Sequence, residues 1–208
     1  MKTTDVDVFL ADTRLHDCEA MAGRLDQESA ERLARISHPL RRAQFVLGRF
    51  LLRQSLRRIY GAAAAGWQLD ALQGKPRLVG AGAPEITLSH SRELVACAIA
   101  RVGIGLDVEY CRERNFTVLA EHFCGPTDLR RFLSLSAAEQ GLRFYELWTL
   151  KEASFKLNGR EMPLAGSKKT PVLVDEEIRH EYFLPREGYL AVLVARSADP
   201  IHLIVHSR

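Results

Sequence analysis

The hydrophobic pattern of the chain changes period between residue 41 and residue 109, and this change limits the fold class. Apolar residues in 41–60 recur with the spacing of an α-helix. The segments 85–89 and 94–100 have the composition of two paired strands, and 103–109 continues as a third strand. A long helix followed by a hairpin predicts a mixed α+β fold.

Further helices are predicted on both sides of these strands. Asp26 is a suitable N-cap for a helix that ends before Pro39. In the second half, Ser136 and Glu139 have the S-x-x-E spacing of a capping box, and the helix is predicted to end before the stop signal at 158–159. Short strands are predicted after it at residues 170–174, 180–183, 190–195 and 201–206.

Both halves of the chain contain helices first and hairpins afterwards. We therefore expect two similar α+β subdomains, residues 1–102 and 103–208, related by a pseudo-two-fold axis, although no residue-level repeat supports it. Ligand sites favour such interfaces, so the active site is expected between the two subdomains.

Composition excludes several classes of protein. A chain of 208 residues with 47% hydrophobic residues can form a packed core, and its longest apolar runs have seven residues, too short to span a bilayer. Residues 1–11 lack a signal-peptide layout, so the expected location is the cytoplasm. The four cysteines have no C-x-x-C spacing and are predicted to be reduced thiols.

The charges are separated along the chain. Residues 32–69 contain eight arginines and no acidic residue: Arg32, Arg35, Arg41, Arg42, Arg49, Arg53, Arg57 and Arg58. Residues 104–155 contain eight carboxylates: Asp107, Glu109, Glu113, Glu121, Asp128, Glu139, Glu146 and Glu152. This separation suits a site that holds phosphates on one side and a metal ion on the other.

Two groups of polar residues share a face of their predicted elements. Asp107 and Glu109 alternate along a strand and therefore point the same way. Thr149, Glu152 and Lys156 are three and four residues apart on a helix, so they also lie on one face.

Two motifs carry a family resemblance. The first is Gly105-Leu106-Asp107-Val108-Glu109, and the second runs from Trp148 to Lys156 with the sequence WTLKEASFK. In this respect the chain resembles the 4′-phosphopantetheinyl transferases, in particular their monomeric Sfp-type branch. Leu106 replaces the usual isoleucine or valine, while Asp128 and Cys124 depart from the family pattern further along.

The resemblance implies transfer of 4′-phosphopantetheine from coenzyme A to a serine of a carrier protein, with release of adenosine 3′,5′-bisphosphate. Asp107, Glu109 and Glu152 are expected to hold Mg²⁺, with Mn²⁺ as the alternative ion, since such hard cations bind a few carboxylates together with phosphate oxygens and water. Lys156 is expected to stabilise charge on the phosphates. Glu152 is also the candidate general base, a role that metal binding would weaken.

Coenzyme A itself needs cations on the other side of the site. Lys75, Ser89 and His90 match the binding segments of the family, and Arg35 and Arg42 are candidate phosphate ligands by their position in the arginine-rich segment. All other histidines are interpreted as structural.

The expected partners are coenzyme A and an apo acyl carrier or peptidyl carrier protein, without nucleic acid or membrane, and the protein is expected to be a monomer. In the predicted helix 41–60, Arg49, Arg53 and Arg57 recur every fourth residue and form a basic face opposite the apolar one. This basic face is either a docking surface for an acidic carrier or an ordinary solvated face. Two alternatives stay open: a metal-dependent phosphodiesterase or nuclease, which could use the same carboxylates, and a non-catalytic nucleic-acid binder, which the arginine content suggests.

Overall fold

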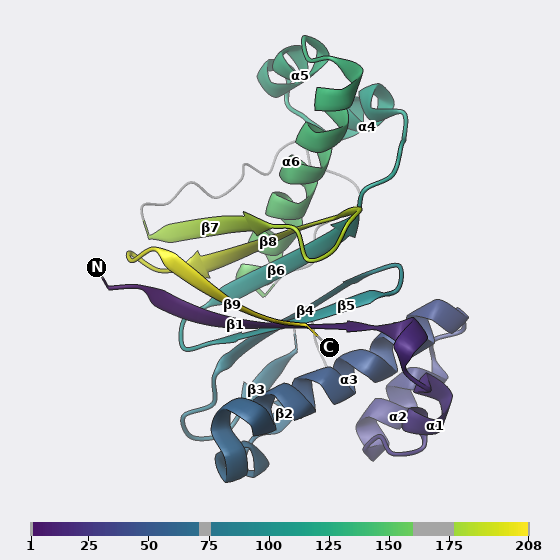
Figure 1. Cartoon of the computed structure of the whole chain (residues 1–208), viewed down its shortest axis with the longest axis vertical. Helices are drawn as coiled ribbons and strands as arrows, with labels where there is room; N and C mark the ends of the chain where they lie inside the picture. The colour runs from purple at the N-terminus through teal and green to yellow at the C-terminus, as the bar shows by residue number, and fades with distance from the viewer. Residues whose placement is uncertain (1, 71–75, 160–176, 208) are drawn as a thin grey trace.

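The fold consists of two β-sheets packed face to face, each covered on its outer side by one long helix. This computed structural model describes residues 2–70, 76–159 and 177–207. Figure 1 shows helix α3 on the outside of one sheet and helix α6 on the outside of the other. The described residues therefore form an α+β fold of four layers.

The first sheet has four strands in the order β4-β5-β1-β9. Their bounds are Glu85–Ser91 for β4, Leu94–Ala100 for β5, Thr4–Asp12 for β1 and Ile201–Ser207 for β9. Strands β4, β5 and β1 pair antiparallel, whereas β9 pairs parallel to β1. The last strand of the chain thus lies beside the first.

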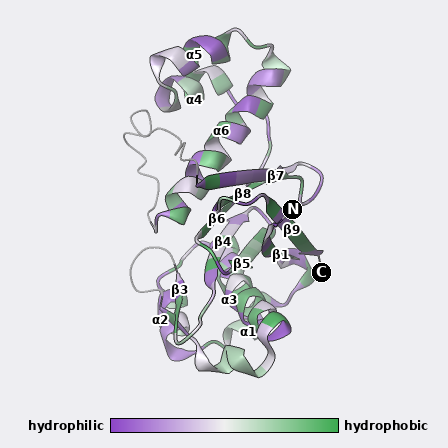
Figure 2. Cartoon of the chain, turned by 90° about the vertical axis from the view of Figure 1, so that its left-hand side faces the viewer, coloured by the Kyte–Doolittle hydropathy of each residue, from purple (hydrophilic) through white to green (hydrophobic). Residues whose placement is uncertain are grey.

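The second sheet has three antiparallel strands in the order β6-β8-β7. Their bounds are Ile104–Tyr110 for β6, Tyr189–Arg196 for β8 and Ile178–Phe183 for β7. Figure 2 shows the polar edge strand β7 in purple beside the hydrophobic β8 in green. A separate short hairpin joins β2, Gln68–Asp70, to β3, Arg77–Val79.

Eight helical segments are described. They are η1 (Thr13–Leu15), α1 (Cys18–Ala22), α2 (Gln27–Ala34), α3 (Pro39–Tyr60), η2 (Gly61–Gly66), α4 (Phe116–Phe123), α5 (Pro126–Leu133) and α6 (Ala137–Leu157). The predicted caps are confirmed: the Asp26 side chain caps α2, and Ser136 and Glu139 form a capping box on α6. Gly159, at φ 68°, follows the end of α6 as predicted. Among the described residues, no helix combines the length and apolarity that a membrane span requires.

The main core lies between the two sheets. Strands β5 and β8 are buried on both faces, because one face of each meets the opposite sheet and the other meets α3 or α6. In β6, the apolar Ile104, Leu106 and Val108 enter this core. Gly105, Asp107 and Glu109 consequently face α6, as the alternation of strand side chains predicts.

Several features differ from the sequence expectations. Strand β9 belongs to the same sheet as β1, so residues 103–208 do not form all their sheet pairings among themselves. Strand β1 and helix α4 were not predicted, and the predicted strand 170–174 lies outside the described residues. Arg49, expected on the exposed basic face of α3, is buried, because α2 and the β2–β3 hairpin cover that part of the helix. The pseudo-two-fold relation stays a prediction.

Candidate functional site

Helix α6 crosses strand β6 at Gly105 with direct backbone contact. A Cβ atom on Gly105 would lie 1.9 Å from the carbonyl oxygen of Ala153 and 2.7 Å from the backbone nitrogen of Leu157. Only glycine therefore permits this approach. The contact brings the side chains on the side of α6 that faces β6 next to the β6 side chains that face α6.

The ammonium group of Lys156 lies at the centre of this contact. Its Nζ atom donates to Asp107 Oδ1 at 2.7 Å, to Ser89 Oγ at 3.0 Å and to the carbonyl oxygen of Leu106 at 3.1 Å. Asp107 is buried and Lys156 is mostly buried, so their ion pair is only weakly screened by solvent. The two sequence motifs thus meet through one charged hydrogen bond.

Side-chain hydroxyls of β4 join the first sheet to β6. Thr87, Ser89 and Ser91 accept hydrogen bonds from the backbone N–H groups of Leu106, Val108 and Tyr110 at 3.3, 3.2 and 3.0 Å. Side chains on one face of a strand, and N–H groups on one edge, recur every second residue, so the same contact repeats three times along β4 and β6. The Ser89 hydroxyl also donates to Asp107 Oδ1 at 2.9 Å.

Glu109 lies next to Asp107 on the same face of β6. It accepts hydrogen bonds from Ser91 Oγ at 2.8 Å and from the indole nitrogen of Trp148 at 3.2 Å. Burial, together with the neighbouring negative charge of Asp107, raises the pKa of Glu109 above its usual range. Two carboxylates in one buried site repel each other, which a cation between them would relieve.

The donor set fits a hard cation in part. Asp107 Oδ2 is buried and has no hydrogen-bond partner, which leaves one carboxylate oxygen available to a ligand. Mg²⁺ needs only one or two carboxylates when phosphate oxygens and water complete its shell. Within residues 2–70, 76–159 and 177–207, however, no three His, Cys, Asp or Glu side chains form a group that could hold a metal ion. The structure therefore brings Asp107 and Glu109 together but does not add Glu152, a half-buried residue one turn before Lys156.

His90 projects from the opposite face of β4 towards the first turn of α3. The guanidinium of Arg41 contacts both ring nitrogens of His90 and also donates to Gln44 Oε1 at 3.3 Å. Burial, followed by the positive charges of Arg41 and Lys156, lowers the pKa of His90 to about 4. At neutral pH the imidazole is therefore uncharged and can donate one N–H hydrogen bond beside two cations.

The other predicted coenzyme A ligands have different surroundings. Arg42 Nη1 donates to the carbonyl oxygens of Leu33 and Ile36 at 2.9 and 3.1 Å, so this arginine caps the end of α2. Arg35 is the exposed C-cap residue of α2, and in the described part of the chain no hydrogen bond or ion pair joins it to Lys156. Lys75 lies outside the described residues.

Sequence reasoning missed three residues that the structure places at the site. Arg41 was one of eight arginines in its segment, and only its contact with His90 separates it from the others. Trp148 belongs to the second motif and Ser91 ends strand β4, but their hydrogen bonds to Glu109 depend on how α6 and β4 meet β6. In the sequence, Gly105 of the first motif was the one signal of the close contact between β6 and α6.

Comparison with known proteins finds similarity in the part of the chain that carries Asp107 and Lys156. Residues 103–186, which include β6, α6 and β7, match the family model of the 4′-phosphopantetheinyl transferase superfamily. The match covers 84 of the 208 residues, so it relates this part of the chain to the superfamily. The matched segment contains the whole of both sequence motifs and therefore includes Asp107, Glu109, Glu152 and Lys156.

Curated relatives from the superfamily extend the match into the first half of the chain. A 4′-phosphopantetheinyl transferase from Bacillus subtilis is 26% identical over 147 residues, covering 70% of this chain and 65% of the relative. The 4′-phosphopantetheinyl transferase Sfp from Bacillus subtilis strain 168 is 27% identical over 67% of this chain and 62% of its own length. A third, psf-1 from Bacillus pumilus, is 27% identical over 76% and 67%. The chain spans less than two thirds of each Bacillus subtilis relative.

Proposed function

We propose that this protein transfers 4′-phosphopantetheine from coenzyme A to a serine of an apo acyl or peptidyl carrier protein. The observation that carries the proposal is the meeting of Lys156 with Asp107 at 2.7 Å, which joins two motifs about fifty residues apart into one buried, charged site. The similarity of residues 103–186 to the superfamily supports the same activity, and the curated relatives named above are called 4′-phosphopantetheinyl transferases.

The proposed reaction breaks one phosphoanhydride bond. The carrier serine oxygen attacks the β-phosphorus of coenzyme A and forms a phosphodiester, while the bond from that phosphorus to the bridging oxygen breaks. The electron pair leaves with adenosine 3′,5′-bisphosphate, and the serine proton passes to a base. Negative charge grows on the bridging oxygen, so positive groups near the pyrophosphate should give the largest rate effect.

Lys156 is the residue in the best position to provide this charge. Its ammonium group is held by Asp107, Ser89 and a backbone carbonyl, which fixes its position before the substrate binds. Asp107 and Glu109 would hold a magnesium ion, which when bound would add electrostatic stabilisation of the phosphate oxygens. Glu152 stays a predicted ligand and general base on the same helix face as Lys156.

The coenzyme A phosphates are proposed to bind on the β4 side of the site. His90, neutral at pH 7, and Arg41 present N–H donors next to each other there. Lys75, Ser89, Arg35 and Arg42 remain proposed ligands of coenzyme A. The hydroxyl of Ser89 already serves Val108, Asp107 and Lys156, so its contribution to coenzyme A would be to hold Lys156 in place.

The division at residue 102, the monomeric state and the cytoplasmic location are proposals that follow from the family resemblance and the sequence. Nothing in the family match or in the relatives supports the phosphodiesterase or the nucleic-acid binder. Product analysis separates the first of these alternatives, since a phosphodiesterase would cleave coenzyme A with water in the absence of a carrier.

A mass-shift assay tests the proposed function directly. A panel of apo acyl and peptidyl carrier proteins is incubated with coenzyme A, Mg²⁺ and the protein, and intact mass reports the gain of one phosphopantetheine group. Glu152→Gln should lose transfer at least 100-fold while keeping its thermal unfolding midpoint, because the amide removes the charge needed for base or ligand. Absence of transfer to every carrier by the wild-type protein would refute the proposal.

A further inference from the structure

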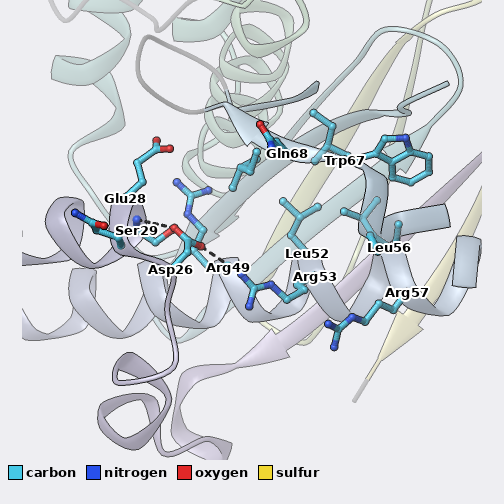
Figure 3. A pocket seen from close by; sticks show the side chains of 15 residues that line it. Asp26, Glu28, Ser29, Arg49, Leu52, Arg53, Leu56, Arg57, Trp67 and Gln68 are labelled. Atoms are coloured by element: carbon cyan, nitrogen blue, oxygen red, sulfur yellow. Dashed lines mark hydrogen bonds and ion pairs between the residues drawn. The ribbon is translucent and has the colours of Figure 1, made fainter. Parts of the chain in front are cut away.

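A cavity lies away from Lys156, between helices α2 and α3 and the β2–β3 hairpin. Its volume is about 670 Å³, large enough for a small organic ligand. Figure 3 shows the side chains that line it, with arginines and leucines of α3 along one side and Trp67 and Gln68 opposite. Within the described chain, no hydrogen bond or ion pair joins its lining residues to Lys156.

Arg49 is the unusual member of this lining. Its side chain is only 9% exposed, and its Nε atom is buried without a hydrogen-bond partner. Burial, followed by the nearby positive charge of Arg32, lowers the pKa of Arg49 to about 10, so the guanidinium is still charged at neutral pH. A buried cation with an unsatisfied donor is costly, and an anionic group bound beside it would offset that cost.

The acids near the cavity do not satisfy Arg49. Asp26 caps α2 through the backbone N–H of Ser29 at 2.9 Å and forms an ion pair with Arg53 at 3.2 Å. The dashed lines in Figure 3 mark both of these contacts. Glu28 also lines the cavity, but no ion pair within 4 Å joins it to Arg49 in the described chain. Among the described residues that line the cavity, Arg49 is therefore the buried arginine without a carboxylate partner, and its guanidinium lies over the Phe45 ring at 4.7 Å. Glu28 is a negative charge that an anion has to pass.

The rest of the lining is largely apolar. Leu52 and Leu56 of α3 form its base, and Trp67, Leu69 and Leu78 of the hairpin region are only half-buried against it. The polar atom of Trp67 is already used, since its indole nitrogen donates to the carbonyl oxygen of Ala81 at 3.1 Å. An occupant would thus bury a hydrocarbon body here rather than a polar one.

We propose that this cavity binds a straight-chain carboxylate. The carboxylate pairs with the guanidinium of Arg49, and the alkyl chain lies along Leu52, Leu56 and Trp67. A carboxylate matches the planar fork of arginine, and the apolar wall rewards each buried methylene group. The site is separate from the proposed transfer reaction and stands whether or not that activity is found.

Calorimetric titration of the full chain with decanoate tests the proposal. Arg49→Met should weaken decanoate binding at least tenfold, because it removes the charged partner and keeps most of the side-chain volume. Arg58→Met is the matched control, since Arg58 is an exposed arginine of α3 that does not line the cavity, and its affinity should stay within twofold of the wild type. Circular dichroism confirms that both variants fold. Equal loss in both, or in neither, overturns the proposal.

Two further measurements do not depend on Arg49→Met folding well. From butanoate to decanoate, affinity for the wild-type protein should rise up to about fourfold per methylene, equivalent to ~0.8 kcal/mol. Glu28→Gln should tighten decanoate binding, since it removes the like charge. Affinity that is independent of chain length, or weaker binding to Glu28→Gln, contradicts the proposed geometry.

Competition with coenzyme A decides whether the cavity is a separate site. Saturating coenzyme A should leave the dissociation constant of decanoate within twofold. Competitive displacement would assign the cavity to the coenzyme A site and overturn the proposal, while leaving the proposed function intact. Conversely, a protein that binds decanoate as expected but transfers nothing to any carrier would retain this cavity and lose the proposed activity.

Discussion

Gly105→Ala is expected to separate the two halves of the Lys156 centre. The added Cβ would lie 1.9 Å from the carbonyl oxygen of Ala153, whereas real Cβ contacts essentially never fall below 3.0 Å. Helix α6 must therefore move away from β6 by about 1 Å, and a misplacement of that size can cost ~100-fold in rate. The 2.7 Å contact between Lys156 and Asp107 would lengthen beyond hydrogen-bond distance.

The same substitution should also lower stability. Overpacking in a well-packed core usually costs about 1–3 kcal/mol, and a clash with backbone, which cannot rotate away, belongs at the upper end of about 3 kcal/mol. Urea unfolding monitored by circular dichroism measures this loss, and the mass-shift assay measures transfer by the fraction that remains folded. We expect a loss in both measurements.

Gly103→Ala provides the control for this prediction. Its Cβ would lie 3.4 Å from Leu157 Cδ1, the end of a flexible side chain, so the change should cost less than about 1 kcal/mol. Both variants make the same chemical change near the start of β6. If Gly105→Ala matches Gly103→Ala in stability and keeps transfer within twofold of the wild type, the close packing of α6 on β6 does not position Lys156.

Two further predictions concern the β4 side of the site. Arg41→Gln should raise the KM for coenzyme A several-fold with little change in stability. Arg42→Gln should instead lower the free energy of unfolding by about 0.5–1.5 kcal/mol, because it uncaps α2. Kinetics and urea unfolding measure the two effects, and a reversed pattern would contradict these roles. Folding lowers the pKa of His90 from about 6.5 to about 4, so between these pH values the unfolded chain binds a proton that the folded chain does not. The free energy of unfolding should therefore fall by roughly 2–3 kcal/mol as the pH drops through this window. His90→Gln should reduce that loss, and unfolding curves at pH 7 and pH 4.5 measure the difference.

Local signals in the sequence were sufficient for most elements. The caps at Asp26 and Ser136 depend on residues within a few positions of each other, and both were predicted correctly. Strand β9 was also found, but its partner was not, because pairing with β1 depends on residues about two hundred positions apart. The alternation of Asp5 and Asp7 with Val6 and Val8 was the available sign of β1.

The site shows the same limit at the level of single side chains. Asp107 and Lys156 could be identified because each belongs to a short motif whose spacing fixes its face on a strand or helix. The arginines of α3 have no such motif: Arg41, Arg42 and Arg49 differ only in what they meet after folding, which is His90, the end of α2 and a cavity. Since a guanidinium is attracted to any acceptor, its role is decided by its neighbours, and those come from parts of the chain that helical spacing does not reach.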